Sequence, residues 1–207
     1  MTQSLKNAAL FTIGHSNHPL ETFLSLLTAH GITAVADVRS SPFSGPNPQY
    51  NQKKLTVALE AVGIRYVFLG DELGARRAEP ECYVDGQARY SLISKLPLFL
   101  GGLDRIRRGI RSFHVALMCA EKEPLSCHRS VLICRHLRGE IDPIRHIKAD
   151  GGIETQAEME QRLLELHGLS ADDLFRSEAE RVEQAYDRQG DIIAYTLSTN
   201  SEMEETL

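Results

Sequence analysis

The chain has 207 residues, of which 42% are hydrophobic, and a formal net charge of −5. This length supports one sizeable core, or one domain with an appendage. No segment approaches the roughly 18 apolar residues that span a bilayer, and the first residues, MTQSLKNAALFTIGH, have no usable secretion signal. Four cysteines without regular spacing do not indicate a disulfide framework. We therefore expect a cytoplasmic protein without a membrane partner.

Short apolar runs alternate with amphipathic stretches from the start of the chain. The predicted strands are 9–14, 34–38, 66–69, 114–118 and a candidate at 144–148. The predicted helices are 20–30, 55–62, 92–110 and 130–137. This alternation predicts an α/β fold with a doubly wound, mostly parallel sheet and helices on both faces.

The character of the chain changes after Gly151-Gly152. Residues 150–207 carry 15 acidic and 4 basic residues, whereas residues 1–149 carry 13 acidic and 19 basic residues. We expect an α/β domain over 1–150 and an acidic helical extension over 151–207 that packs on it. The extension would hold helices at 155–167 and 177–186, a short strand or packed segment at 191–195, and a frayed tail from about 198.

A basic first part suits an anionic partner, although a charge of this size spread over about 150 residues is also ordinary. The carboxyl ends of parallel strands meet at one edge of a sheet, where open α/β folds bind ligands. His15, Asp37, Arg39, Gly70 and Cys119 all lie at or just after predicted strand ends. His15 is a candidate general base, and Asp37 a candidate base or orienting group. Asp37 and Arg39 form either an anion site or a structural ion pair.

The stretch FHVALMCAEKEPLSCHRSVLICRHL, residues 113–137, predicts a buried strand, a polar loop and a helix. Cys119, Cys127, His128 and Arg129 lie in the loop and at the helix entrance. A helix start and an arginine there would hold an anion and lower the pKa of a thiol. We interpret Cys119, Cys127 and His128 as candidate catalytic residues and Arg129 as an anion ligand. Buried packing is the alternative for the cysteines.

Two long loops complete the predicted site. The first, SSPFSGPNPQY over 40–50, offers Ser40 and Ser44 as ligand contacts and Phe43 and Tyr50 as stacking rings. The second follows Gly70 and offers Arg76, Arg77 and Tyr83. Ordinary surface loops are the alternative for both.

The residue types of Cys119, Cys127, His128 and His15 suit zinc. The C-x7-C-H spacing matches no familiar zinc pattern, and adjacent Cys and His ligands are awkward. We therefore expect an anion site without a metal or another cofactor.

Five motifs occur in a characteristic order: TIGHSN, ADVRSSPFS, YVFLGDELG, YVDGQARY and LMCAEKEPLSCHRSVLICRHL. Together they resemble the bacterial family filed as domain of unknown function 488, from about Thr12 to Leu137. The resemblance implies an α/β cytoplasmic protein that is suspected to be an enzyme, with no activity to carry over. The matching residues include His15, Asp37, Arg39, Gly70, Tyr83, Cys119, Cys127, His128 and Arg129.

A fainter similarity is to rhodanese and thiol-phosphatase folds, whose arginine follows the cysteine by about five or six positions. Here Arg129 follows Cys119 by ten positions and Cys127 by two. We favour an enzyme, a hydrolase or transferase, that acts on a phosphate-bearing ligand, either a small nucleotide or a nucleic acid. The alternatives are a thiol-dependent enzyme and a non-catalytic nucleotide or nucleic-acid binding module.

Overall fold

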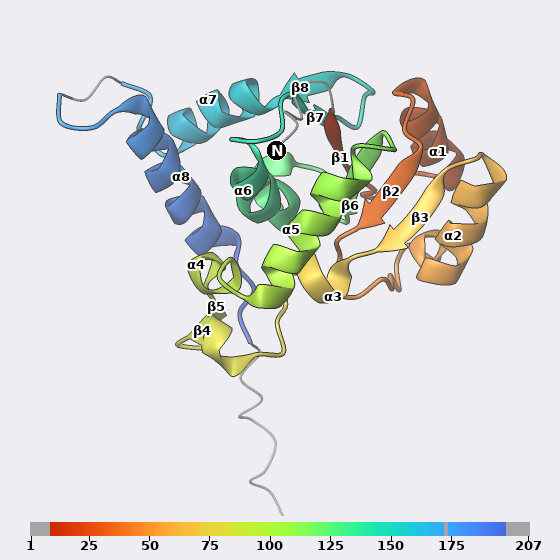
Figure 1. Ribbon diagram of the computed structural model, residues 1–207, viewed down its shortest axis with the longest axis horizontal. Coiled ribbons are helices and arrows are strands. Elements are labelled where there is room, and N and C mark those ends of the chain that lie inside the picture. Colours follow the sequence, from red (N-terminus) through yellow and green to blue (C-terminus); the bar gives the residue numbers. More distant parts are fainter. Residues whose placement is uncertain (1–8, 172–173, 198–207) are drawn as a thin grey trace, which may run out of the picture.

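A six-stranded sheet forms the centre of the computed structural model, which describes residues 9–171 and 174–197 (Figure 1). The strand order is β3-β2-β6-β1-β7-β8. The first five of these strands are parallel, and β8 is antiparallel to β7. The strands are β1 (Leu10–Gly14), β2 (Ala34–Asp37), β3 (Arg65–Phe68), β6 (Val115–Cys119), β7 (Ile144–Ile147) and β8 (Ile153–Thr155). The prediction of a mostly parallel α/β fold is confirmed.

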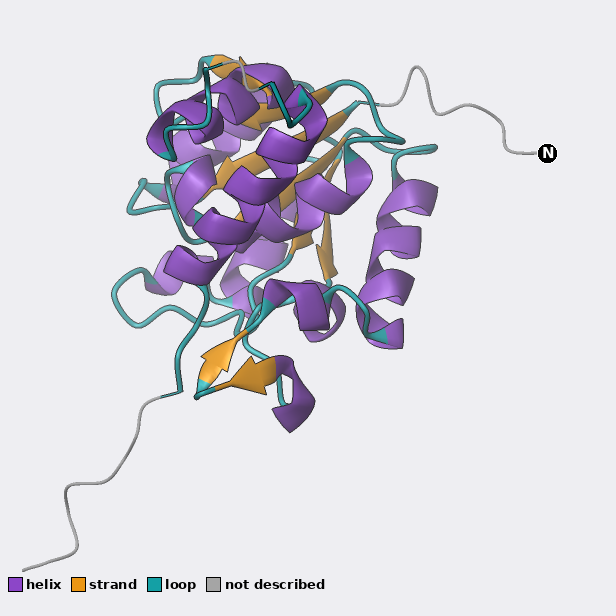
Figure 2. Cartoon of the chain, turned by 90° about the vertical axis from the view of Figure 1, so that its left-hand side faces the viewer, coloured by secondary structure: helices purple, strands orange, loops and turns teal. Residues whose placement is uncertain are grey.

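Two layers of helices enclose the sheet (Figure 2). One face is covered by α1 (Leu20–Ala29) and α2 (Gln52–Ala61), which bury Phe23, Leu27, Leu55 and Leu59 against it. The other face is covered by α5 (Pro97–Gly109), the wide-turned helix η4 (Arg129–Cys134) and α6 (Arg135–Leu137). The β1 and β6 strands between these layers are buried along their whole length, which fits central parallel strands.

The topology places a crevice at one edge of the sheet. The chain leaves β1 and β2 toward the α1/α2 layer, but it leaves β6 toward the opposite layer. Because β6 lies between β2 and β1, neighbouring loops diverge at their carboxyl ends. Such a switch point is where open α/β folds bind ligands.

Several short elements lie where the sequence predicted loops. Gly70–Leu73 forms α3, so the segment after β3 begins as a helical turn. The single helix predicted over 92–110 is instead two, α4 (Tyr90–Ile93) and α5, which begins at Pro97. A small hairpin joins β4 (Tyr83–Val84) to β5 (Gln87–Ala88). Proline-initiated 3-10 turns occupy η1 (Pro48–Tyr50), η2 (Pro80–Cys82) and η3 (Pro124–Ser126). These elements are too short for hydrophobic periodicity to reveal.

Two C-terminal helices pack on the same core as α5 and η4. They are α7 (Gln156–Leu166) and α8 (Glu178–Ile193), and each begins with a capping box, at Thr155/Glu158 and Ser177/Glu180. At 191–195 the alternative of a short strand is wrong, because α8 continues to Ile193, whereas the alternative of a packed segment is confirmed by Ile193 and Tyr195, which pack against the core. Its buried residues keep the helical spacing beyond Tyr186, to Gln189 and Gly190. The expected boundary at residue 150 stays a prediction, and the expected frayed tail from 198 lies outside the described residues.

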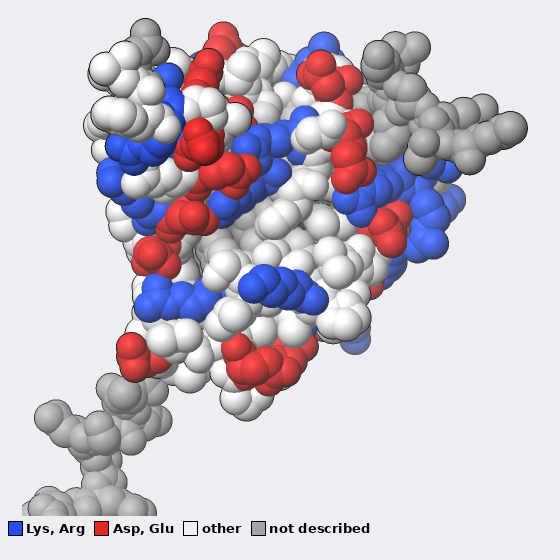
Figure 3. Space-filling model, turned by 60° about the vertical axis from the view of Figure 1, so that its left-hand side comes forward, with Lys and Arg blue, Asp and Glu red and all other residues white. Residues whose placement is uncertain are grey.

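The acidic residues of these helices pair with arginines of the preceding chain. Glu183 bonds Arg135 at 2.6 Å and Arg138 at 2.7 Å, and Glu160 bonds Arg138 at 2.9 Å. Positive and negative side chains consequently intermingle on this side of the molecule (Figure 3). The charge asymmetry of the sequence thus accompanies packing between two parts of one chain. Among the described residues no helix is both long and apolar enough to cross a membrane.

A buried histidine in strand β7 makes the free energy of unfolding depend on pH. The ring of His146 in β7 is bonded to the Thr12 hydroxyl and to the Gln156 side chain, and burial lowers its pKa to about 4. Since an unfolded histidine titrates near 6.5, acidification favours the unfolded chain as the pH falls from 6.5 toward 4. We expect His146 to contribute a loss of about 2 kcal/mol between pH 7 and pH 5.

Urea unfolding at both pH values measures this loss. His146→Gln should be less stable at pH 7 but should show a smaller fall in stability on acidification. An equal fall in both proteins would contradict the assignment to His146.

Candidate functional site

A cavity of about 290 Å³ opens at the carboxyl ends of the central strands. Loops after β1, β2 and β6 meet there with the segment after α3 and the end of α8. Of the predicted site residues, the cavity is lined by His15, Arg39, Ser40, Ser44, Arg76, Cys119 and His128. Chain segments far apart in sequence therefore converge at the topological switch point.

Arg39 at the floor of the cavity is held by a buried ion pair. Its Nε and Nη2 atoms donate to the two carboxylate oxygens of Asp37 at 2.9 and 2.6 Å. Nη2 also donates to the Tyr50 carbonyl, and the Tyr66 hydroxyl donates to Asp37 at 2.8 Å. Asp37 is fully buried and does not line the cavity, so its geometry is that of a residue that orients Arg39.

His15 presents an unprotonated ring nitrogen beside Arg39. Its Nδ1 donates to the Ser16 carbonyl at 2.8 Å, which leaves Nε2 to face Arg39 Nη1 at 3.3 Å. The ring stacks on Tyr50 with centroids 4.1 Å apart. Burial lowers the pKa of His15 to about 4, and the Arg39 charge also lowers it. The imidazole is neutral near pH 7 and accepts rather than donates through Nε2.

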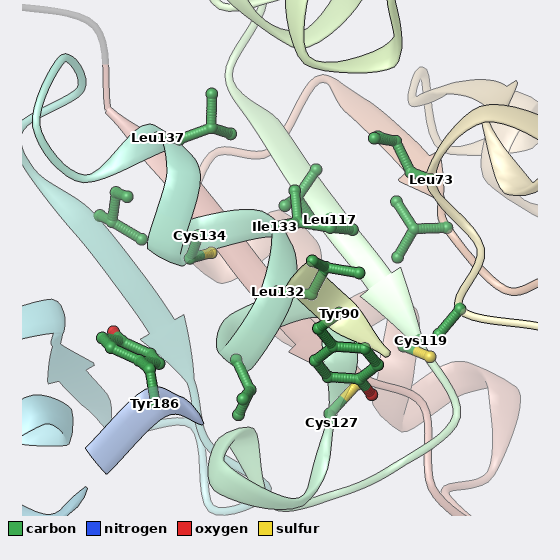
Figure 4. Close-up of a cluster of buried hydrophobic side chains, with 14 of the residues drawn as sticks. Leu73, Tyr90, Leu117, Cys119, Cys127, Leu132, Ile133, Cys134, Leu137 and Tyr186 are labelled. Atoms are coloured by element: carbon green, nitrogen blue, oxygen red, sulfur yellow. The ribbon is translucent and has the colours of Figure 1, made fainter. Parts of the chain in front are cut away.

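Two cysteines, a histidine and a carboxylate form a cluster beside the cavity. His128 Nδ1 lies 3.7 Å from Cys119 Sγ and 4.0 Å from Cys127 Sγ, and Cys127 Sγ lies 3.1 Å from Glu121 Oε2. Cys119, Glu121 and His128 line the cavity, whereas Cys127 lies behind them. Figure 4 shows both sulfur atoms beside Tyr90, with Cys134 further along the helix.

The two thiols titrate as a pair. The hydrogen bond with Cys127, together with burial, raises the pKa of Cys119 well above its ordinary value. Burial alone would raise the pKa of Cys127, but the Cys119 thiol and the Arg129 charge outweigh it and hold this pKa well below its ordinary value. Of the two thiols, Cys127 is therefore the one that loses its proton more easily.

Arg129, the first residue of η4, is fully buried and does not line the cavity. Its guanidinium donates to the carbonyls of Glu121 at 2.6 Å and Lys122 at 3.2 Å, and to the Thr12 hydroxyl at 3.4 Å. These bonds fix the loop that follows β6. The geometry is that of a loop support rather than the anion ligand that the sequence suggested.

Four other predicted ligand contacts lie outside the cavity lining. Tyr50 is buried beneath His15, and Arg77 pairs with Glu79 at 2.7 Å. The Tyr83 hydroxyl bonds the Arg77 backbone, and Gly70 packs so tightly that a Cβ would overlap the Arg39 carbonyl oxygen. Each position supports the site from behind, and its own polar groups are engaged within the chain.

Sequence reasoning did not single out several residues of the cavity and cluster. One of them is Glu121. Its position in the sequence could have revealed it, because it lies two residues after Cys119, at the edge of the same loop. Ser41, Ser126, Ile193 and Tyr195 also line the cavity. Tyr195 follows α8, and no local pattern indicates that the end of this helix reaches the sheet edge.

The fold and the site define a doubly wound α/β protein with a polar cavity at its switch point. The chain belongs to the family described as Domain of unknown function DUF488, whose model matches residues 19–135, more than half of the chain. The predicted family resemblance is confirmed, although His15 lies before the matched range. No curated protein and no solved structure matches the chain.

Proposed function

We propose that this protein is a cytoplasmic enzyme, a hydrolase or transferase, that acts on a small phosphate-bearing ligand, a nucleotide, in the switch-point cavity. The observation that carries the proposal is the pair of guanidinium groups in the cavity lining, from Arg39 and Arg76. Arg76 is exposed, and within the described part of the chain no carboxylate lies within ion-pair distance of it. Paired arginines suit the oxygens of a phosphate group.

Serine hydroxyls supply further donors for a phosphate. Ser40 Oγ accepts the Arg76 backbone N–H at 2.9 Å, and Ser44 Oγ accepts the Asn47 backbone N–H at 3.2 Å. Each hydroxyl oxygen is thereby positioned while its own proton stays available to a ligand oxygen. Both serines line the cavity with Ser41 between them. This arrangement supports the phosphate subsite.

Aromatic rings on the cavity lining support a nucleotide rather than a bare phosphate. Phe43 lines the cavity but is 67% exposed, which is unusual for a large apolar side chain. The Tyr195 ring also lines it and lies 4.8 Å beneath the Arg76 guanidinium. Exposed rings next to cations are typical stacking surfaces for bases.

His15 is the group that we propose for proton transfer. Its unprotonated Nε2 faces Arg39 Nη1 at 3.3 Å in the cavity lining, and it can accept a proton from a hydroxyl or water that replaces this contact next to the bound phosphate. A thiol enzyme fits less well. Cys127, whose pKa is lowered, does not line the cavity, and the hydrogen bond with Cys127 together with burial raises the pKa of Cys119, which does line it.

Calorimetric titration with AMP, ADP, ATP, inorganic phosphate and adenosine tests the proposal. We expect nucleotides to bind, and Arg76→Ala to weaken binding by roughly 10- to 100-fold, the effect of one charge-assisted hydrogen bond. Arg145→Ala is the matched control, since Arg145 stacks on Phe11 at 5.7 Å but does not line the cavity.

Adenosine binding as tightly as AMP, or equal losses in both variants, would contradict a phosphate site. Phosphorus NMR on the same mixtures then decides between an enzyme and a binding module. Conversion of a bound nucleotide supports the enzyme, and tight binding without conversion of any nucleotide supports the module.

A further inference from the structure

Four potential metal ligands come together from two ends of one loop. Cys119 and Glu121 leave the end of β6, and Cys127 and His128 enter η4. One sulfur, nitrogen or oxygen atom from each of the four residues lies within 4.8 Å of the other three. Cys119, Cys127 and His128 are at most 8% exposed, so their donor atoms are shielded from bulk water. This close group of two thiols, an imidazole and a carboxylate requires a physical explanation.

The two distances from His128 Nδ1 to the sulfurs are close to those around one tetrahedral ion, whereas the 3.1 Å between Cys127 Sγ and Glu121 Oε2 is shorter. Zinc–sulfur bonds of about 2.3 Å and zinc–nitrogen bonds of about 2.0 Å place tetrahedral ligand atoms about 3.5–3.8 Å apart. His128 Nδ1 lies 3.7 Å from one sulfur and 4.0 Å from the other. The cluster therefore needs only small side-chain adjustments to hold an ion.

The protonation of His128 is suited to metal binding. Its Nε2 lies 3.0 Å from the Val38 carbonyl oxygen, which can only accept, so Nε2 carries the proton. Nδ1, on the other side of the ring, faces the two sulfurs and supplies its lone pair to an ion once it carries no proton. A metal-bound histidine characteristically donates its other N–H to such a carbonyl.

The backbone explains how adjacent residues reach one point. Cys127 is extended, with φ −136° and ψ 136°, whereas His128 is helical, with φ −60° and ψ −25°. This change of direction turns both side chains toward Cys119. The Arg129 backbone N–H also lies 3.4 Å from Cys127 Sγ, a contact that stabilises a thiolate. The objection to adjacent Cys and His ligands, made from the sequence, thus loses its force.

We propose that Cys119, Cys127, His128 and Glu121 bind one zinc ion at the wall of the cavity. Two thiolates and an imidazole favour zinc over the hard cations magnesium and calcium. Three of the four ligands line the cavity, so the ion would be accessible from it. The proposal does not rest on nucleotide binding, which depends on Arg39 and Arg76.

Elemental analysis of protein purified without chelator from zinc-supplemented cells is the first test. We expect about one zinc per chain, in keeping with a four-ligand site. After removal of zinc, titration with cobalt should produce thiolate-to-cobalt charge-transfer absorption that saturates at about one equivalent. Wild-type protein with neither zinc nor this absorption would overturn the proposal.

Single-residue variants show which side chains bind the ion. Cys119→Ser and Cys127→Ser should lose the charge-transfer signal or shift it markedly, whereas Cys82→Ser and Cys134→Ser, which alter buried cysteines outside the cluster, should keep it. Glu121→Gln covers the case in which the cysteine variants fail to fold, because residue 121 is exposed. Glu121→Gln should weaken zinc binding at least about 10-fold, whereas Glu123→Gln should leave zinc binding unchanged.

Equal zinc affinity in wild type and Glu121→Gln would remove Glu121 from the ligand set, and retained cobalt absorption in folded Cys127→Ser would overturn the site. Nucleotide titration of the chelated protein separates this proposal from the previous one. Arg76-dependent binding that survives without zinc leaves the proposed function intact even if the zinc site fails.

Discussion

Asp37→Ala should lower the free energy of unfolding by about 3–5 kcal/mol, the cost of leaving a buried charge unpaired. Asp37 is fully buried and accepts hydrogen bonds from the Nε and Nη2 atoms of Arg39, which is itself only 5% exposed. The variant would also deprive the Tyr66 hydroxyl of its acceptor. Urea unfolding at pH 7 measures the change.

Two control variants distinguish the cost of an unpaired buried charge from the cost of lost packing. Tyr66→Phe removes one hydrogen bond to the same carboxylate and should cost only about 1 kcal/mol. The double variant Asp37→Leu/Arg39→Met removes both charges and should recover much of the loss, as apolar replacements of buried ion pairs often do. If the double variant is as unstable as Asp37→Ala plus Arg39→Met combined, the unpaired-charge explanation is wrong.

Gly14→Ala is the second substitution with a large expected effect. A Cβ on Gly14 would overlap the Glu121 carbonyl oxygen and lie 2.8 Å from its carbonyl carbon. Both atoms belong to the backbone. Because Arg129 also donates a hydrogen bond to the Glu121 carbonyl, the loop after β6 can move away from Gly14 only by breaking that bond. We expect a loss of about 3 kcal/mol or more in the free energy of unfolding.

Gly101→Ala provides the matched control, with an effect of opposite sign. Gly101 lies in α5, where a Cβ would meet nothing within 4 Å. Alanine there should stabilise the protein by about 0.5–1 kcal/mol through its better helix propensity. A Gly14→Ala protein as stable as wild type would show that the loop after β6 is not fixed against β1.

The sequence was sufficient to predict the sheet and the edge at which the cavity lies. Short apolar runs identified the strands, and the convergence of parallel strand ends follows from topology alone. That argument brings His15, Arg39 and Cys119 to one cavity. The end of α8 could not be placed in this way, because its docking through Gln189 and Tyr186 depends on tertiary packing.

The roles of individual charged residues were less predictable. Sequence shows that Arg129 and Arg77 are cations near the site, but not that backbone carbonyls and Glu79 saturate them. Arg76, next in sequence to Arg77, has no such partner and faces the cavity. Which of two neighbouring arginines is available depends on loop geometry that residue type does not encode. The spacing of Cys119, Cys127 and His128 likewise does not show that the loop after β6 brings their side chains together.

Backbone amide NMR with AMP added to the labelled protein tests most directly whether the switch-point cavity is the nucleotide site. We expect shifts concentrated at residues that line the cavity: Ser40, Ser41, Phe43, Ser44, Arg76, Ala120 and Glu121. A second hollow, between α5 and strands β2 and β3 and lined in part by Arg65, Arg105 and Arg108, serves as an internal comparison. Shifts confined to that hollow, or none at saturating AMP, would contradict the account.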